Sequence, residues 1–586
     1  MLRFLLLLLL LTACSTPPRP VPSPPAPPPV VSAPEPLAPR PLVRVYWLLP
    51  DGTPAEWGVL PPGTPLVTPL PEGRWYVVPL APVRTEAEAL ALAAVLREHR
   101  VPGLSFGEVA LPEPALLARL VEGTSLTTLL LADTPFTDAH LAALRGLETL
   151  ESLHLSRTRV TNAGLVHLEG RTRLAELLLN ETAVSVRGMV SLVPLTGLRR
   201  LGLGSTAVGS QGLEFLATLG QLEWLDLSDT VVDDALLASL PGTHLRTLIL
   251  SGTGVTDAGL AALRRMPALE ELGLGRTATT DAGLKHLAGL SSLRALVLSK
   301  TRVGGKGLRW LAGLSHLQVL LLDGTSLSNV GLQHLAPLRA LRELDLSRTV
   351  ITGSGLRVLR GFTLLESLGL AEVPLDDASL EALAPLLALA RLDLSATPIS
   401  VEALRRLGSR EALRHLDLSH TRLEDGWLPS LQAFPHLQSL HLVRTQVTDL
   451  GLERLAALPE LETLYLRATP IDGPGLTALE KLPRLSALEL GATRVDDASA
   501  QALARLGRLT WLSLARTRVT DAALPHLPRS LRTLYLTRNP VTDAGVASLL
   551  LLPELRALDL RGTNVSAEAQ ARLVRERGVR LTAPSP

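Results

Sequence analysis

Residues 341–349 read LRELDLSRT, and this nine-residue phrase recurs nineteen times along the chain. In each copy, two or three leucines at positions 1, 4 and 6 alternate with polar residues, which is typical of a short strand with one buried face. The ninth residue is followed by x-Val or x-Ile and then by a short helical signal, clearest at residues 256–260, TDAGL. The sequence therefore predicts a repeated unit of strand, turn and helix.

The spacing of the ninth position sets the register of these repeats. Sixteen of the eighteen steps between successive ninth positions are 24 residues, one is 23 and one is 22. A fixed period in this range predicts a stacked solenoid, because no single repeat can bury its own apolar face. The ninth positions are Thr134, Thr158, Thr182, Thr206, Thr230, Thr253, Thr277, Thr301, Thr325, Thr349, Val373, Thr397, Thr421, Thr445, Thr469, Thr493, Thr517, Asn539 and Thr563.

These repeats resemble the leucine-rich repeat family, in the variety written LxxLxLxxTxVTDAGLxxL. The resemblance covers residues 101–581 and implies an α/β solenoid with a curved, parallel concave sheet and helices on its convex side. Many relatives carry asparagine at the ninth position, which this chain has only at Asn539. We expect the threonines to bond to backbone in or next to their own repeat. Val373, followed by Pro374, is a candidate local irregularity. The scaffold hosts many binding roles, so the resemblance leaves function open.

The first thirteen residues, MLRFLLLLLLLTA, have the layout of a secretory signal, and their apolar run is too short to span a bilayer. Leu11 to Cys14 resemble the bacterial lipobox, which implies cleavage after Ala13 and acylation of Cys14. An ordinary signal peptide is the alternative. Cys14 is the only cysteine, so the one thiol sits where lipidation needs it and no disulfide within the chain is possible. Ser15 is not the aspartate that signals inner-membrane retention in enteric bacteria, so outer-membrane delivery is favoured.

Three further segments follow the signal. Residues 14–41 are nearly half proline and predict a semi-rigid tether behind Cys14. Residues 42–100 predict a small α/β cap, with strands at 43–49 and 74–80 and a helix at 85–99 whose N-cap is Thr85. Residues 101–582 contain the nineteen clear repeats and one degenerate first repeat, with Val109 at its ninth position. Solenoids need such caps because their ends would otherwise expose core leucines.

Composition supports a core of stacked leucines and excludes some functions. Hydrophobic residues make up 46% of the chain, yet aromatic residues make up only 3%. The formal net charge is +1, so no global field favours nucleic acid, and we expect no nucleic-acid partner.

Signals of enzyme chemistry are mostly absent from the sequence. It has no glycine-rich phosphate loop after a strand, no HExxH, no GxSxG and no paired CxxC, so we expect a non-enzymatic protein without a cofactor. Asp417 and His441 lie one repeat apart at the same position and could form a metal site or an acid–base pair. The alternative is a hydrogen bond shared by two polar residues on a solvated sheet.

The outward strand positions, 3 and 5, vary in charge and aromatic content from repeat to repeat. Aromatic and arginine side chains usually contribute most interface energy, so we predict a partner-binding surface on the concave face of repeats thirteen to eighteen. We expect Tyr465, Trp511 and Tyr535 to face solvent there, and Trp224 to face solvent on the same strand positions of an earlier repeat. The predicted partner-binding residues are His415, Asp417, His441, Tyr465, Trp511, Arg516, Tyr535 and Arg538.

The sequence therefore favours a lipid-anchored binding protein of the bacterial envelope. Its expected partner is an unidentified envelope or extracellular protein, and its expected contact with the membrane is the lipid on Cys14. Two alternatives stay open. One is a structural envelope protein without a specific ligand, and the other is an enzyme or metal-binding protein around Asp417 and His441.

Overall fold

The computed structural model describes residues 43–48, 54–60, 75–107, 109–240, 242 and 244–581. The predicted signal segment, Cys14 and the proline-rich tether lie outside the described residues, as do residues 49–53 and 61–74 of the predicted cap. The chain divides into two compact units, Met1–Val297 and Leu298–Pro586.

The first unit begins with an antiparallel sheet that corresponds to the predicted cap. Strand β1 (Val43–Leu48) pairs with both β2 (Pro54–Leu60) and β3 (Trp75–Pro79). The sequence predicted β1 and β3 but not β2, which contains Pro54 and Gly58 and so lacks a plain strand pattern. Strand β3 then pairs in parallel with β4 (Gly103–Ser105), the strand of the degenerate first repeat, so that the cap continues into the repeats.

The helix of the cap begins where the sequence predicted. Helix α2 (Glu86–Glu98) has Thr85 as its N-cap, and the Thr85 hydroxyl accepts a hydrogen bond from Glu88 N at 3.3 Å. The Glu88 carboxylate in turn accepts one from Thr85 N at 2.9 Å. This reciprocal pair satisfies two amide groups that a helix start otherwise leaves without partners.

Each later repeat contributes one short strand, which covers positions 3 to 5 of the phrase. Neighbouring strands are parallel and in register, so that Leu416 pairs with Leu440 and Leu440 with Leu464. In the first unit they are β5 (Thr128–Leu130), β6 (Ser152–His154), β7 (Glu176–Leu178), β8 (Arg200–Gly202), β9 (Trp224–Asp226), β10 (Thr247–Ile249), β11 (Glu271–Gly273) and β12 (Ala295–Val297). In the second unit they are β13 (Val319–Leu321), β14 (Glu343–Asp345), β15 (Ser367–Gly369), β16 (Arg391–Asp393), β17 (His415–Asp417), β18 (Ser439–His441), β19 (Thr463–Tyr465), β20 (Ala487–Glu489), β21 (Trp511–Ser513), β22 (Thr533–Tyr535) and β23 (Ala557–Asp559). The two-residue strand β24 (Arg580–Leu581) follows the last repeat and pairs in parallel with β23.

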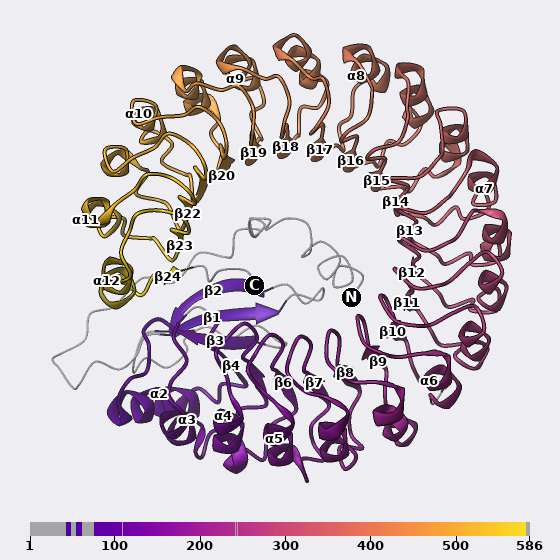
Figure 1. Cartoon of the computed structure of the whole chain (residues 1–586), viewed down its shortest axis with the longest axis vertical. Helices are drawn as coiled ribbons and strands as arrows, with labels where there is room; N and C mark the ends of the chain where they lie inside the picture. Colours follow the sequence, from indigo (N-terminus) through magenta and orange to yellow (C-terminus); the bar gives the residue numbers. More distant parts are fainter. Residues whose placement is uncertain are drawn as a thin grey trace. The chain divides into compact units, whose positions relative to one another are not determined.

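Within each unit, the strands line the inner side of an arc and short helices line its outer side (Figure 1). The predicted helices are short, with one to three turns each, because each must return to the next strand within one 24-residue period. The α-helices after α2 are α3 (Pro114–Val121), α4 (Asp138–Ala143), α5 (Asn162–Leu165), α6 (Asp234–Ser239), α7 (Asn329–Gln333), α8 (Val401–Leu407), α9 (Asp449–Leu455), α10 (Ala500–Leu503), α11 (Val546–Leu549) and α12 (Ala567–Arg577). The 3₁₀-helices are η1 (Leu144–Gly146), η2 (Val166–Leu168), η3 (Val186–Leu192), η4 (Ser210–Thr218), η5 (Gly259–Arg265), η6 (Gly283–His286), η7 (Lys306–Leu311), η8 (Gly355–Gly361), η9 (Asp377–Leu383), η10 (Asp425–Ala433), η11 (Pro474–Lys481), η12 (Leu524–His526) and η13 (Asp543–Gly545).

The core of each unit is a stack of leucines from positions 1, 4 and 6. Leu341, Leu344 and Leu346 are each 0% exposed, and the same holds for most of their counterparts. Each leucine completes the apolar contacts of its neighbours, which is why the repeats must stack to fold. The solenoid with parallel strands inside and helices outside, predicted from the 24-residue period, is thereby confirmed.

The threonines at the ninth position of the phrase, which we call the threonine column, bond to backbone as predicted. All seventeen threonines donate their hydroxyl hydrogen to the carbonyl oxygen of the leucine three residues earlier, at 2.5 to 2.7 Å. Asn539 instead reaches the preceding repeat, where its Nδ2 donates to Leu514 O at 2.8 Å. Val373 keeps the turn, since its N–H still bonds to Leu370 O at 3.3 Å, and only the hydroxyl bond is lost.

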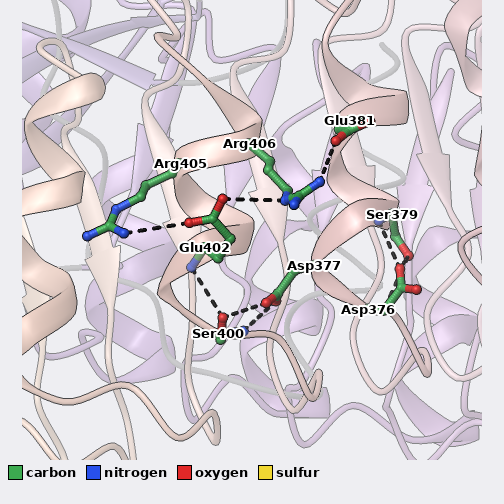
Figure 2. Close-up of polar contacts among 8 residues, drawn as sticks. All are labelled: Asp376, Asp377, Ser379, Glu381, Ser400, Glu402, Arg405 and Arg406. Atoms are coloured by element: carbon green, nitrogen blue, oxygen red, sulfur yellow. Dashed lines mark hydrogen bonds and ion pairs between the residues drawn. The ribbon is translucent and has the colours of Figure 1, made fainter.

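Side chains on the helix side connect one repeat to the next. Figure 2 shows Asp377 of η9 accepting hydrogen bonds from Ser400 N at 2.7 Å and from the Ser400 hydroxyl at 2.5 Å, across 23 residues of sequence. On the exposed surface nearby, Arg406 of α8 forms ion pairs with Glu381 at 2.5 Å and Glu402 at 3.5 Å. The Asp377–Ser400 and Glu381–Arg406 contacts join neighbouring repeats, whereas the Glu402–Arg406 pair lies within α8. Of the three, only the Asp377–Ser400 contact satisfies backbone at a helix start.

Candidate functional site

The predicted partner-binding residues lie on the concave side of the second unit, over strands β17 to β22. His415 and Asp417 belong to β17, His441 to β18 and Tyr465 to β19. Trp511 lies on β21 and Tyr535 on β22, while Arg516 and Arg538 occupy the exposed turns that follow these two strands. Because the repeat register is uniform, residues 24 apart at these positions become lateral neighbours.

Four rings form a continuous row, which we call the aromatic ladder: His441, Tyr465, Trp511 and Tyr535. The ring centroids of His441 and Tyr465 are 4.3 Å apart, those of Tyr465 and Trp511 6.1 Å, and those of Trp511 and Tyr535 5.4 Å. The planes are tilted by 52° to 57°, an arrangement that aromatic pairs favour over flat stacking. The sequence showed that these residues share a face but not that they touch.

A small residue on β20 allows the rings of Tyr465 and Trp511, which lie on either side of this strand, to approach each other. Strand β20 lies between those of Tyr465 and Trp511, and its position 3 is Ala487, which pairs in register with Trp511. A large side chain there would separate the two rings, whereas alanine leaves the indole room to approach Tyr465 at 6.1 Å.

The expectation that Trp511 faces solvent is wrong. Its side chain is only 7% exposed, because Tyr465 and Tyr535 flank it. Trp224 in the first unit is also 7% exposed, with the Arg200 guanidinium 4.6 Å from its ring centroid. Tyr465 and Tyr535 are half-buried, so they are the ring surfaces that a partner can reach.

Asp417 and His441 do contact each other, and Ser439 extends the contact. His441 Nδ1 lies 3.3 Å from Asp417 Oδ2, and His441 Nε2 lies 3.2 Å from the Ser439 hydroxyl. This order of hydroxyl, imidazole and carboxylate occurs in serine hydrolases. Catalysis by such a set also needs free N–H donors for an oxyanion. Here Ser439 N is bonded to Arg414 O at 2.8 Å within the sheet, and Ser439 is only 8% exposed.

The same Ser-Leu-His sequence in the first unit supports a structural role for this pair. Ser152 and His154 of β6 repeat the hydroxyl–imidazole distance of 3.2 Å. His154 Nε2 then lies 3.3 Å from Glu176 Oε2, and Arg200 Nε lies 2.8 Å from Glu176 Oε1. Both sets are polar contacts between neighbouring strands, which stabilise a sheet. The geometry at His441 therefore favours the shared hydrogen bond over acid–base chemistry.

Carboxylates at position 5 also serve the turn that ends the strand. Asp393 Oδ1 accepts from Ser395 N at 2.8 Å, and Asp417 Oδ1 accepts from Ser419 N at 2.8 Å. Asp559 Oδ1 likewise accepts from Arg561 N at 3.0 Å. The recurring sequence LDLS signals this local turn, in which the aspartate satisfies a backbone N–H two residues later.

Burial changes the acidity of these carboxylates. Burial, reinforced by the charge of Asp417, raises the pKa of Asp393 to about 6. Burial alone would also raise the pKa of Asp417, but the hydrogen bond and charge of His441 hold it below its ordinary value. Burial raises the pKa of Glu489 as well. Asp393 and Glu489 therefore lack a neighbouring cation strong enough to offset their desolvation, whereas Asp417 has His441.

The described residues contain neither a metal cluster nor a membrane-spanning helix. No group of three or more histidine, aspartate or glutamate side chains among them lies close enough to hold a metal ion. Within the same residues, no helix combines the length and the apolarity needed to cross a bilayer. A cleft of about 230 Å³ in the first unit is lined mainly by polar residues, including Glu151, Glu176, Arg199 and Arg200 beside Trp75.

Comparison with known families identifies the repeat. A family model described as leucine-rich repeat matches residues 243–263, 339–359, 435–456 and 528–550, each spanning one strand phrase with flanking helix. The chain is built of leucine-rich repeats. A search of curated proteins finds no sequence similar to it.

Several solved structures resemble the chain at low sequence identity. Internalin InlF from Listeria monocytogenes is 21% identical, with a TM-score of 0.38, over 60% of this chain and 89% of that chain. A leucine-rich-repeat protein of Leptospira interrogans is 18% identical, with a TM-score of 0.34, over 86% of this chain and 100% of that chain. One chain of the mouse RP105/MD-1 complex is 23% identical, with a TM-score of 0.44, over 77% of this chain and 82% of that chain.

Proposed function

We propose that this leucine-rich-repeat protein is anchored to the bacterial envelope through Cys14 and binds a protein partner on the concave face of repeats thirteen to eighteen. Leucine-rich repeats are typical scaffolds for protein–protein interaction, since they offer an extended and rigid surface. The observation that supports this site most directly is the continuous aromatic ladder, which the repeat register does not require.

The chemistry of this face suits a protein partner. Tyrosine, tryptophan and arginine dominate the binding energy of protein interfaces, and all three occur together here. Tyr465 and Tyr535 expose part of their rings, while the buried Trp511 holds both in place from between. Rigid aromatic groups lose little conformational entropy when they bind, which favours affinity.

The test begins with capture of the partner in intact cells. A photo-crosslinking residue at an exposed site beside the ladder, such as position 492 in the turn after β20, should capture a discrete protein that mass spectrometry can identify. Titration with the purified partner should then show that Tyr465→Ala and Tyr535→Ala each weaken binding by about 1 to 4 kcal/mol. Trp310→Ala is a matched control, because Trp310 is a 41% exposed aromatic residue on the outer helix η7.

Tyrosine variants are the better probes because Trp511 is buried. Removing a buried tryptophan typically costs about 3 to 5 kcal/mol of folding stability, so Trp511→Ala would confuse folding with binding. Unchanged affinity in both tyrosine variants, with Trp310→Ala equally neutral, would exclude the ladder as the binding site.

The anchor has its own experiment. The sequence LTAC with a single cysteine supports acylation of Cys14, and several acyl chains give a stable attachment to a membrane. Cells supplied with labelled palmitate should incorporate it into the wild-type protein, and Cys14→Ala should lose the label and move to the soluble envelope fraction. Fractionation of the wild type should place the label in the outer membrane. Absence of label in the wild type would refute the lipoprotein assignment.

A further inference from the structure

Eight exposed arginines follow the strands of repeats thirteen to nineteen. They occupy positions 7 and 8 of the phrase and the first residue after it, which we call position 10. No aspartate or glutamate occupies any of these positions in the seven repeats. We call this set the arginine rim. It comprises Arg422, Arg444, Arg467, Arg494, Arg516, Arg518, Arg538 and Arg561.

The same positions in the first unit are balanced in charge. Repeats one to seven place three acids and three arginines there: Asp133, Glu181 and Asp229 with Arg157, Arg159 and Arg276. Arg157 forms ion pairs with Asp133 and, at 3.2 Å, with Glu181. Arg276 Nη2 lies 2.8 Å from Asp229 Oδ2. In the first unit, the acids and arginines at these positions therefore neutralise most of one another's charge.

The arginine rim is largely unpaired. Arg494 lies 3.5 Å from Asp472, and Arg561 pairs with Asp559. The other six arginines form no ion pair with any residue in the described part of the chain. Neighbouring strands lie about 4.8 Å apart. The like charges that follow them on successive repeats therefore repel one another unless a counter-charge comes from outside.

The backbone at position 8 shows that the scaffold does not need arginine there. Arg516 has φ 58° and Arg538 has φ 57°, which are left-handed values that favour glycine. Gly562 occupies the same position in the next repeat with φ 68°. Glycine would fit these turns with less strain, so Arg444, Arg516 and Arg538 represent an added surface property rather than a requirement of the fold.

The strand face beside the rim limits what kind of anion can bind. It carries the aromatic ladder and the carboxylates of Asp393, Asp417 and Glu489. A uniformly anionic polymer lying along the strands would meet these carboxylates as well as the arginines. An extended peptide, however, directs alternate side chains to opposite sides and can present acids to the rim and apolar groups to the ladder.

We infer that the second unit recognises an extended protein segment with acidic side chains along one edge, which pair with the arginine rim, and apolar side chains that pack on the aromatic ladder. This inference rests on the proposed function, since it specifies the chemistry of the partner at the same concave site. The rim supplies selection by charge and a faster encounter, and the ladder supplies contact area.

The experiment measures binding of fluorescent twelve-residue peptides to the full chain by anisotropy at low and moderate salt. The probes are alternating Glu-Tyr, Gln-Tyr and Lys-Tyr peptides and a single-stranded DNA of twelve nucleotides. The rim variant is Arg516→Gln with Arg538→Gln. Its matched control is Arg157→Gln with Arg276→Gln, which changes the same position 8 in the first unit where acids already pair with the arginines. A ladder variant, Tyr465→Ala with Tyr535→Ala, completes the set.

We expect the Glu-Tyr peptide to bind most tightly, to weaken with salt, and to lose about three- to tenfold in affinity in the rim variant but not in the control. Loss in the ladder variant without loss in the rim variant would overturn the acidic-segment inference and leave the concave site standing. Loss in neither variant would refute both. Tighter binding of DNA than of the Glu-Tyr peptide would replace the inference with a general polyanion surface.

Discussion

At the scale of single residues, the eighth position of the phrase has the most unusual backbone. All nineteen copies have positive φ there: sixteen non-glycine residues between 52° and 62°, and Gly252, Gly324 and Gly562. The sequence indicated a turn after each strand but not its handedness, because only three of the nineteen residues are glycine. Stacking of the repeats holds the other sixteen in a conformation that costs each about 1 kcal/mol or more.

This strain predicts that Ala468→Gly stabilises the protein. Ala468 has φ 57°, so glycine relieves the strain, and a net gain of about 0.5 kcal/mol remains after its greater freedom in the unfolded chain. Ala456→Gly is the control, since Ala456 has φ −58° at the end of α9 and glycine should destabilise there. Chemical denaturation of both variants measures the difference. A loss of stability in Ala468→Gly would contradict the assignment of strain.

Substitutions at two buried residues of one repeat distinguish the stability that the leucine core contributes from the stability that the threonine hydroxyls contribute. Leu440 is 0% exposed, so Leu440→Ala should cost about 2 to 5 kcal/mol through the cavity that it leaves. Thr445→Val should cost about 1 kcal/mol, because it removes only the 2.7 Å hydroxyl bond to Leu442 O. Denaturant midpoints give both values. Equal and negligible effects would mean that the repeat register is wrong.

At the scale of elements, the sequence TDAGL describes a connection between repeats. Asp257 accepts from Thr280 N at 2.8 Å and from the Thr280 hydroxyl at 2.6 Å in the next repeat. Gly283 then leaves room for this aspartate, since a Cβ on Gly283 would lie 2.3 Å from Asp257 Oδ1. The motif was visible in the sequence as a helix start. Its contact with the neighbouring repeat was not, because periodicity alone does not show which direction a side chain takes.

The pair drawn in Figure 2 tests this connection by a double-mutant cycle. Asp377→Ala and Ser400→Ala should each destabilise by about 1 to 2 kcal/mol, because Asp377 bonds both the amide and the hydroxyl of Ser400. The double variant should cost less than the sum of the two, with a coupling of about 1 kcal/mol. Glu381→Gln nearby is the control, and loss of its exposed ion pair with Arg406 should cost less than about 1 kcal/mol. Strict additivity would show that the two residues do not interact.

At the scale of the whole molecule, the features that could be predicted from the sequence are those that its local and repeated patterns determine. The repeat register, the leucine core, the threonine bonds and the Thr85 cap all depend on local pattern, and all are confirmed. The contacts of the candidate site depend on how side chains lean across neighbouring strands. The burial of Trp511 is an example, since it depends on the small Ala487 on the neighbouring strand and on Tyr465 and Tyr535, and no single repeat contains that information.

Burial of acids along the second unit also predicts how its stability changes with pH. Burial raises the pKa of Glu343 to about 7 and, with the charge of Asp417, that of Asp393 to about 6. Between about pH 5 and these values, the native chain holds protons that the unfolded chain has released. Stability from these groups is therefore present at pH 5 and lost as pH rises through the native pKa.

Substitution of Glu343 by glutamine isolates this effect from all other titrating groups. Glutamine resembles the protonated acid, so Glu343→Gln should match the wild type at pH 5 and exceed it by about 1 to 2 kcal/mol near pH 8, after allowance for solvent screening. Asp393→Asn should show the same sign, with its change ending nearer pH 6, because asparagine can still accept from Ser395 N. Urea denaturation at pH 5, 6, 7 and 8 measures both differences. If the stability difference between Glu343→Gln and the wild type stays constant across this range, burial does not retain a proton on Glu343 and the concave face is already charged in the native state.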